Sequence, residues 1–252
     1  MSKNLIKATS LALLMMFTFA CQKEVKHQQA NDELITGANK DQGHLKQTKT
    51  FSSDLVNSWL NMQLKMFQTP LPAGTGSQAT DRAMAYSGIA IYEAVVPGMP
   101  AYRTLSGQLT SFPAMPEAEN GKAYHWAASA NAALAEISRK LFPTTAAANK
   151  TRIDQLEDSL KNIYASQVEV ATLNRSIAFG KEVATRVAAW AATDGTANVN
   201  PAYVPPVGPG LWVPTAPAPA ANPYAYQQRL LVPGSNAGTE LVPPPPYSTD
   251  PA

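Results

Sequence analysis

Apolar residues recur at helical spacing through most of residues 51–195, and short Pro- and Gly-containing stretches interrupt the pattern. The pattern predicts helices over about residues 53–67, 77–96, 117–142, 146–165 and 167–193. In the first of these, Leu55, Trp59 and Met62 mark one face. An Asp194-Gly195 pair ends the last. The sequence therefore predicts an all-α domain of about five helices.

The stretch 77–102 differs from the other helices because it is apolar on nearly every side. Between residues 83 and 96 the polar exceptions are Ser87, Glu93 and two tyrosine hydroxyls. A helix of this kind must be enclosed by others. Its roughly 14 apolar residues are fewer than the ~20 that a bilayer requires. We therefore expect it to be the central buried helix of the bundle.

The last two predicted helices carry different faces. In residues 146–165 we expect Ile153 and Ile163 to face inward and Glu157 to face water. Residues 167–193 carry a ridge of small side chains at four-residue intervals, namely Ser176, Gly180, Ala184, Ala188 and Ala192. Such a ridge lets another helix approach closely, and it would serve as a docking surface if the chain left it uncovered.

Residues 196–252 have a different composition, because they hold two thirds of the chain's 21 prolines. Proline neither continues a helix nor donates to a strand ladder, so this segment is predicted to be extended, with polyproline-like pieces. Its recurring aromatic residues, Tyr203, Trp212, Tyr224, Tyr226 and Tyr247, are expected to anchor it on the helical domain.

The first 20 residues have the pattern of a lipoprotein signal peptide. Lys3 and Lys7 precede an apolar stretch, and Ala20 is followed by Cys21, the single cysteine of the chain. Because a disulfide needs a partner, we interpret Cys21 as the lipidation site of a bacterial lipoprotein, against ordinary secretion with an incidental cysteine. The protein is then expected to be extracytoplasmic and lipid-anchored to a bacterial membrane, in the periplasm or at the cell surface.

Residues 21–50 are polar and aperiodic, which is typical of a flexible tether. His27 and His44 lie in it, but two isolated histidines lack the spacing of metal ligands. Removal of residues 1–20 takes Lys3 and Lys7 from the 20 basic residues, which leaves 18 against 18 acidic ones. This neutral balance, with no basic run, argues against a nucleic-acid partner.

Two residues are candidates for chemistry. Glu93 is the carboxylate within the apolar stretch. It is either a general acid with a raised pKa, or a structural group in an ion pair or a helix-end hydrogen bond, with Arg82, Arg103 or Arg139 as candidate partners. His125 is either a base or a partly buried histidine bonded to a loop carbonyl. We favour the structural interpretation of both, and regard weak phosphatase activity from the two together as a third, lesser option.

Four stretches in order resemble the N-terminal helical half of the vanadium-dependent haloperoxidases and of their phosphatidic acid phosphatase type 2 relatives. They read RAMAYSGIAIYEAVVPGMPAY, AYHWAASANAALAEISRKLFPTT, RSIAFGKEVATRVAAWAATDG and YVPPVGPGLWVPTAP, the last followed by PPPPY. The resemblance covers about residues 53–250. Residues 218–240 depart from it, because they lack the Trp-Gly pair and the Arg-Pro-Phe run common there in the family.

The resemblance implies vanadate, or phosphate in the phosphatases, held by a lysine, two arginines, a Ser-Gly-His run and a further histidine. Those motifs come after the proline-rich segment in the family. Here Ser-Gly occurs as Ser87-Gly88 and Ser106-Gly107, and neither pair is followed by histidine. No catalytic, cofactor-binding or metal-binding residue is therefore assigned, and we expect the chain to be inactive alone.

The domain organisation expected from the sequence has four parts: a signal peptide (1–20), a tether (21–50), a helical domain (51–195) and an extended segment (196–252) that ends before the catalytic region. The expected function is support of a catalytic half that this chain lacks, with that half or a second copy as partner. The alternative is a lipid-anchored binding or scaffold protein that stands alone without catalysis.

Overall fold

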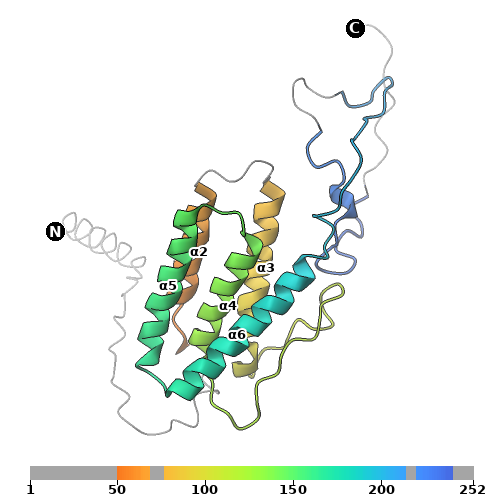
Figure 1. Ribbon diagram of the computed structural model, residues 1–252. Helices are drawn as coiled ribbons and strands as arrows, with labels where there is room; N and C mark the ends of the chain where they lie inside the picture. The colour runs from red at the N-terminus through yellow and green to blue at the C-terminus, as the bar shows by residue number, and fades with distance from the viewer. Residues whose placement is uncertain (1–49, 69–76, 214–219, 241–252) are drawn as a thin grey trace, which may run out of the picture. The chain divides into compact units, whose positions relative to one another are not determined.

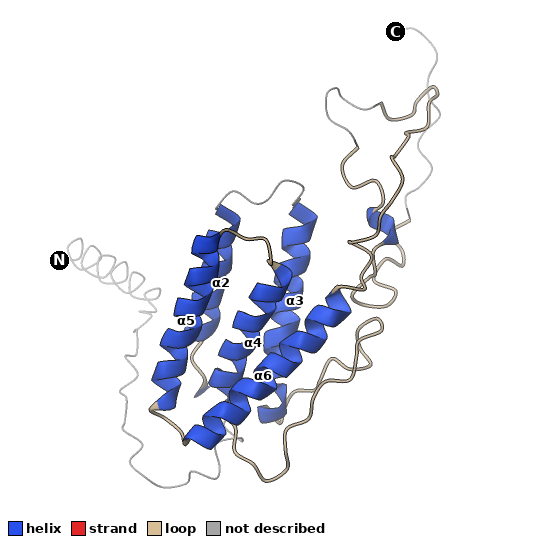
Figure 2. Cartoon of the chain, viewed as in Figure 1, coloured by secondary structure: helices blue, strands red, loops and turns tan. Residues whose placement is uncertain are grey.

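The computed structural model describes residues 50–68, 77–213 and 220–240 (Figure 1). These residues form the helices α2 (Asp54–Gln68), α3 (Ser77–Val95), η2 (Val96–Gly98), α4 (Trp126–Leu141), α5 (Ala147–Ala165), α6 (Val170–Ala191) and η3 (Ala225–Gln227). No strand occurs in this part of the chain (Figure 2). The predicted all-α fold with five main helices is confirmed. The signal peptide, Cys21, His27 and His44 lie outside the described residues.

The helix at the centre of the bundle is α4, not the predicted stretch 77–102. It contacts α2, α3, α5 and α6, and 11 of its 16 residues are buried. By contrast, α3 buries one side, which includes Ala83, Tyr86 and Ala90, and leaves Gly88 exposed. Because α4 is built largely from Ala and Ser, neighbours can approach it from every side.

The most extensive of these contacts is between α4 and α6, which cross in Figure 1. A Cβ atom on Gly180 would lie 2.1 Å from the carbonyl oxygen of Ser129, so the crossing requires glycine. Ser176 and Ala184 on the same ridge are also buried. The N-terminal part of the ridge, from Ser176 to Ala184, is thus covered within the chain and is not a free docking surface, whereas Ala188 is half-buried and Ala192 is exposed.

Helix α4 begins nine residues later than the pattern suggested. His125 adopts an extended backbone conformation and caps α4, because its Nδ1 accepts a hydrogen bond from the Ala128 N–H. The expectation for α5 also fails at two positions. Ile163 is 51% exposed, whereas the Glu157 side chain is only 13% exposed and pairs with Arg139 at 2.5 Å.

Buried polar contacts fix how the helices face one another. The indole Nε1 of Trp59 in α2 donates to Asn131 Oδ1 in α4 at 2.9 Å. Gln63 in α2 donates to the Ser87 hydroxyl in α3 at the same distance. Because an unpaired polar group in a core is costly, these pairs favour one arrangement of α2 against its neighbours.

The described parts of the proline-rich segment contain one short helix, η3, and many exposed side chains. Trp212 is 55% exposed and Tyr226 is 79% exposed. Tyr203 packs edge-on against Tyr224 of the same segment. The prediction that aromatic residues anchor this segment is therefore wrong for Trp212 and Tyr226, and Tyr247 lies outside the described residues. Within residues 220–240, the hydrogen bonds to the helical domain come from Arg229 and Leu231.

Candidate functional site

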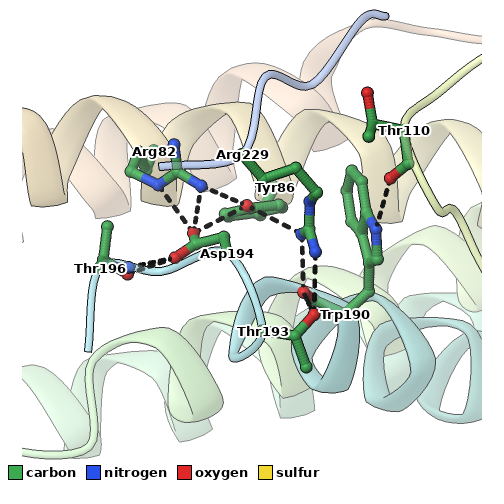
Figure 3. Close-up of polar contacts among 8 residues, drawn as sticks. All are labelled: Arg82, Tyr86, Thr110, Trp190, Thr193, Asp194, Thr196 and Arg229. Atoms are coloured by element: carbon green, nitrogen blue, oxygen red, sulfur yellow. Dashed lines mark hydrogen bonds and ion pairs between the residues drawn. The ribbon is translucent and has the colours of Figure 1, made fainter. Parts of the chain in front are cut away.

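A polar cluster joins α3, the end of α6 and residue 229 (Figure 3). At its centre is Asp194, which follows the last turn of α6 and is 3% exposed. Its carboxylate forms an ion pair with the Arg82 guanidinium of α3, whose Nε donates to Oδ2 at 2.7 Å. Arg82 also donates to the Tyr86 hydroxyl at 2.7 Å, and that hydroxyl donates to Asp194 Oδ2 at 2.8 Å.

The second carboxylate oxygen of Asp194 holds the chain as it leaves α6. Its Oδ1 accepts hydrogen bonds from the Thr196 N–H at 2.8 Å and from the Thr196 hydroxyl. An aspartate side chain that bonds the backbone two residues on makes an Asx turn. The following Gly195 has a φ of 90°, a conformation that favours glycine. Asp194 thus ends α6, as the sequence indicated, and also ties α6 to α3.

These contacts shift two ionisation equilibria. Burial by itself would raise the pKa of the Asp194 carboxyl. The hydrogen bonds from Thr196, followed by those from Arg82 and Tyr86, outweigh burial and hold its pKa below the ordinary value. Burial, with the hydrogen bond to Asp194, raises the pKa of the Tyr86 phenol. The cluster therefore favours an ionised carboxylate beside a neutral phenol.

A second arginine reaches the end of α6 from the proline-rich segment. Arg229 donates from Nη2 to the Trp190 carbonyl oxygen at 2.7 Å and from Nη1 to the Thr193 hydroxyl at 2.8 Å. Its guanidinium carbon lies 4.2 Å from the centroid of the Trp190 ring. The last carbonyl groups of a helix lack partners within it and attract cations. Arg229 therefore caps α6 from a distant position in the sequence.

Trp190 links this cap to the loop between η2 and α4. Its indole Nε1 donates to the Thr110 carbonyl oxygen at 3.1 Å, as Figure 3 shows. The rings of Tyr86 and Phe112 pack edge-on against it, with centroids 5.3 and 4.9 Å away. Such aromatic contacts fix the position of the indole ring. The aromatic and polar contacts together join four segments of the chain.

Glu93 lies apart from this cluster and has a structural role, as we favoured, but with other partners than the arginines. It is 2% exposed and accepts hydrogen bonds from the Thr104 hydroxyl at 2.8 Å and from the Leu105 N–H at 2.6 Å. The favoured arginine partners are wrong: Arg82 pairs with Asp194, and Arg139 pairs with Asp154 and Glu157. Glu93 anchors the loop that follows η2.

His125 is structural by its contacts. Besides the Nδ1 cap, its Nε2 lies 2.9 Å from the Gln167 side-chain oxygen, and its ring packs against Tyr164. A neutral ring that accepts at Nδ1 and donates at Nε2 satisfies both contacts. The Nε2 partner is thus the side-chain carbonyl oxygen of Gln167, which lies in the loop between α5 and α6. The structure does not bring His125 and Glu93 together in a shared hydrogen-bond network.

The cluster around Asp194 does not fit a vanadate or phosphate. An oxyanion requires cations and donors that are free to turn toward it. Arg82 is neutralised by Asp194, Arg229 is engaged with Trp190 and Thr193, and the carboxylate at the centre would repel an anion. Among the described residues, no group of three or more His, Cys, Asp or Glu could hold a metal ion.

Sequence reasoning missed this cluster. Arg82 and Asp194 are 112 residues apart, and Arg229 is 35 residues further on. Asp194 was interpreted as a helix stop, and Arg82 as a partner for Glu93. The sequence offered one signal for the cluster, namely a carboxylate directly after a long helix and before a glycine. This signal does not indicate which residue the carboxylate pairs with.

The comparisons with known proteins point to one fold. No family model matches the sequence, and no curated protein matches it. Among solved structures, a bacterial vanadium-dependent iodoperoxidase matches with a TM-score of 0.63 and 27% sequence identity. The match covers 78% of this chain and 46% of that one. The chain thus has a haloperoxidase-like all-α fold and spans less than half the length of this neighbour.

Proposed function

We propose that this chain is the N-terminal helical part of a vanadium haloperoxidase-like protein. It supports a vanadate- or phosphate-binding catalytic part that lies outside these 252 residues. The single observation that carries the proposal is the match to the iodoperoxidase, which spans most of this chain but only 46% of that one. The described residues supply a braced helical scaffold and no cradle for an oxyanion.

The bracing is the chemistry that the chain itself provides. The Asp194 cluster joins α3 to the end of α6, Glu93 holds the loop after η2, and Arg229 attaches the proline-rich segment. Each is a buried or partly buried polar contact, and those of Asp194 and Arg229 join segments distant in sequence. Such contacts fix one arrangement of the segments, as a scaffold for a separate catalytic part requires.

Activity assays test the proposal directly. The purified chain should show no oxidation of iodide by hydrogen peroxide above the buffer rate, with or without orthovanadate, and no hydrolysis of a chromogenic phosphate ester. His125→Ala should leave both readings unchanged. Vanadate-dependent oxidation by the chain alone, or ester hydrolysis lost in His125→Ala, would show that the catalytic residues are present here.

We further propose that Cys21 is acylated and tethers the protein to a bacterial membrane. Within the described residues no helix is long and apolar enough to cross a membrane. Labelling with radioactive palmitate in a bacterial host should mark the wild-type chain and sediment it with the membrane fraction. Cys21→Ser should remove both the label and the sedimentation. A Cys21→Ser chain that still sediments with membranes would contradict the lipid anchor.

A lipid-anchored binding or scaffold protein without catalysis remains the second candidate. The exposed apolar side chains of the proline-rich segment favour it, because Val199, Val207 and Val213 are each more than 70% exposed. The DNA downstream of Ala252 separates the two. A continuing frame that encodes Ser-Gly-His and a later arginine and histidine supports the first proposal, whereas a frame without them supports the second.

A further inference from the structure

The described hydrogen bonds between residues 220–240 and the helical domain concentrate at two nearby positions. The Arg229 N–H donates to the Asp194 carbonyl oxygen at 2.8 Å, and the Thr110 N–H donates to the Leu231 carbonyl oxygen at 2.9 Å. The Arg229 side chain adds its contacts with the end of α6. The segment is therefore attached over a short length rather than along its whole course.

The attachment is favourable but incompletely satisfied. The Arg229 guanidinium lies over the Trp190 ring, donates to two oxygens at the end of α6, and donates at 3.4 Å to the Tyr86 hydroxyl of α3. Its Nε is nevertheless buried without a hydrogen-bond partner. The hydroxyl of Thr110 is likewise buried without a hydrogen-bond partner. A buried donor without a partner opposes docking, because it loses its bonds to water. The docked state thus gains less than its contacts alone suggest.

Apolar burial by the segment is also small. Leu231 packs partly buried against the aromatic cluster, but Leu230 is 40% exposed and Val232 is 50% exposed. The ion pair between Arg82 and Asp194 closes without Arg229. Regions with few buried apolar contacts open at a lower free energy than the core.

From these observations we propose that residues 220–232 form a strap. The strap docks on the end of α6 through Arg229, and it releases as a unit while the helical domain stays folded. When it releases, the Trp190 face and the last carbonyl groups of α6 become accessible. This property belongs to the described residues and does not depend on the function proposed above.

Hydrogen exchange of the full chain, read by mass spectrometry, tests the strap. In Arg229→Ala, peptides that contain the Thr110 and Arg229-position amides should exchange about tenfold faster than in wild type. Peptides from the interior of α4 should be unchanged. Tyr226→Ala is the matched control, because this side chain is 79% exposed in the same segment, and it should leave both groups of peptides at wild-type rates.

Limited trypsin digestion gives a second reading that does not require alanine at position 229. Arg229→Lys keeps a trypsin site but loses the planar fork that spans two oxygens. Cleavage after residue 229 should be about tenfold faster in Arg229→Lys than in wild type. Circular dichroism of both variants should show the wild-type helix content.

Three results would overturn the strap. Equal acceleration in the α4 peptides would show that the segment is an integral part of the folding unit. Unchanged exchange at the Thr110 amide in Arg229→Ala would show that Arg229 does not hold the segment. Equal trypsin cleavage of wild type and Arg229→Lys would show that the docked state gives no protection.

Discussion

Replacing Asp194 by alanine should lower the free energy of unfolding by about 3 kcal/mol. The substitution removes the acceptor of the Arg82 ion pair, of the Tyr86 hydroxyl and of both Thr196 hydrogen bonds. It also leaves the Arg82 guanidinium partly buried without a counter-charge. The loss should be larger than that from any exposed ion pair of the same chain.

The magnitude follows from the burial of the two partners. Removing one partner of a fully buried ion pair costs about 3–5 kcal/mol. Asp194 is 3% exposed but the Arg82 side chain is 18% exposed, so water compensates part of the loss. We therefore expect about 2–4 kcal/mol for Asp194→Ala, and about 1–3 kcal/mol for Asp194→Asn, which keeps one acceptor.

The effect should depend on pH in a defined direction. The folded pKa of Asp194 lies below its ordinary value of 3.8, so the unfolded chain binds more protons at this site between the two values. Stability from this carboxylate is present above about pH 4 and is lost as the pH falls through the folded pKa. The difference in the free energy of unfolding between wild type and Asp194→Ala should therefore become smaller at acidic pH.

Urea unfolding followed by circular dichroism measures these differences. Glu182→Ala is the matched control on the same helix, because Glu182 pairs with Arg186 four residues on and both side chains are exposed. That variant should lose less than about 0.5 kcal/mol. In thermal unfolding, Asp194→Ala should melt about 6–12 °C below wild type.

The reasoning is refuted if Asp194→Ala unfolds within about 0.5 kcal/mol of wild type, the level of the exposed Glu182 control. It is also refuted if the loss for Asp194→Ala stays constant from pH 7 to pH 3. Either result would mean that the Arg82–Asp194 contact does not tie α3 to α6 in solution.

Three further predictions concern other positions. Glu93→Ala removes both loop hydrogen bonds. It should therefore lower the free energy of unfolding by about 1–3 kcal/mol and speed hydrogen exchange in residues 104–109. Hydrogen exchange at the wild-type rate in these residues would contradict this role. Gly180→Ala should lower the free energy of unfolding by about 1–3 kcal/mol, because its Cβ would clash with Ser129. Gly88→Ala, which has open space around it, should raise the free energy of unfolding by up to about 1 kcal/mol. Thermal unfolding measures both changes. In alkali, wild type should lose stability above pH 10.0 as the pH rises through the raised pKa of Tyr86. Tyr86→Phe should remove that part of the loss, and an identical alkaline profile would exclude this role of Tyr86.

The helices themselves follow from local sequence. Periodic apolar positions and flanking Pro and Gly residues placed the starts and ends of α2, α5 and α6 within a few residues. The start of α4 was missed because residues 117–125 contain helix-compatible residues, while the cap that fixes the start is a histidine bonding Ala128. Histidine is not among the residues usually found at a helix N-cap, so the sequence did not mark this helix start.

The choice of central helix did not follow from apolar character. The stretch 83–96 is the more continuously apolar, yet the alanine- and serine-rich α4 is enclosed. Close packing between helices depends on how small the side chains of the central helix are, as well as on its hydrophobicity. The crossing of α6 over α4 is an example, because no residue larger than glycine fits at position 180 against Ser129.

The sequence by itself determined an all-α domain and the bounds of most of its helices. Only the tertiary structure decided the partners of the buried charges. Asp194 finds Arg82 across 112 residues, and Glu93 finds a loop rather than an arginine. The physical reason is that helix formation depends on neighbours within a few positions, whereas an ion pair depends on which surfaces the packing brings together.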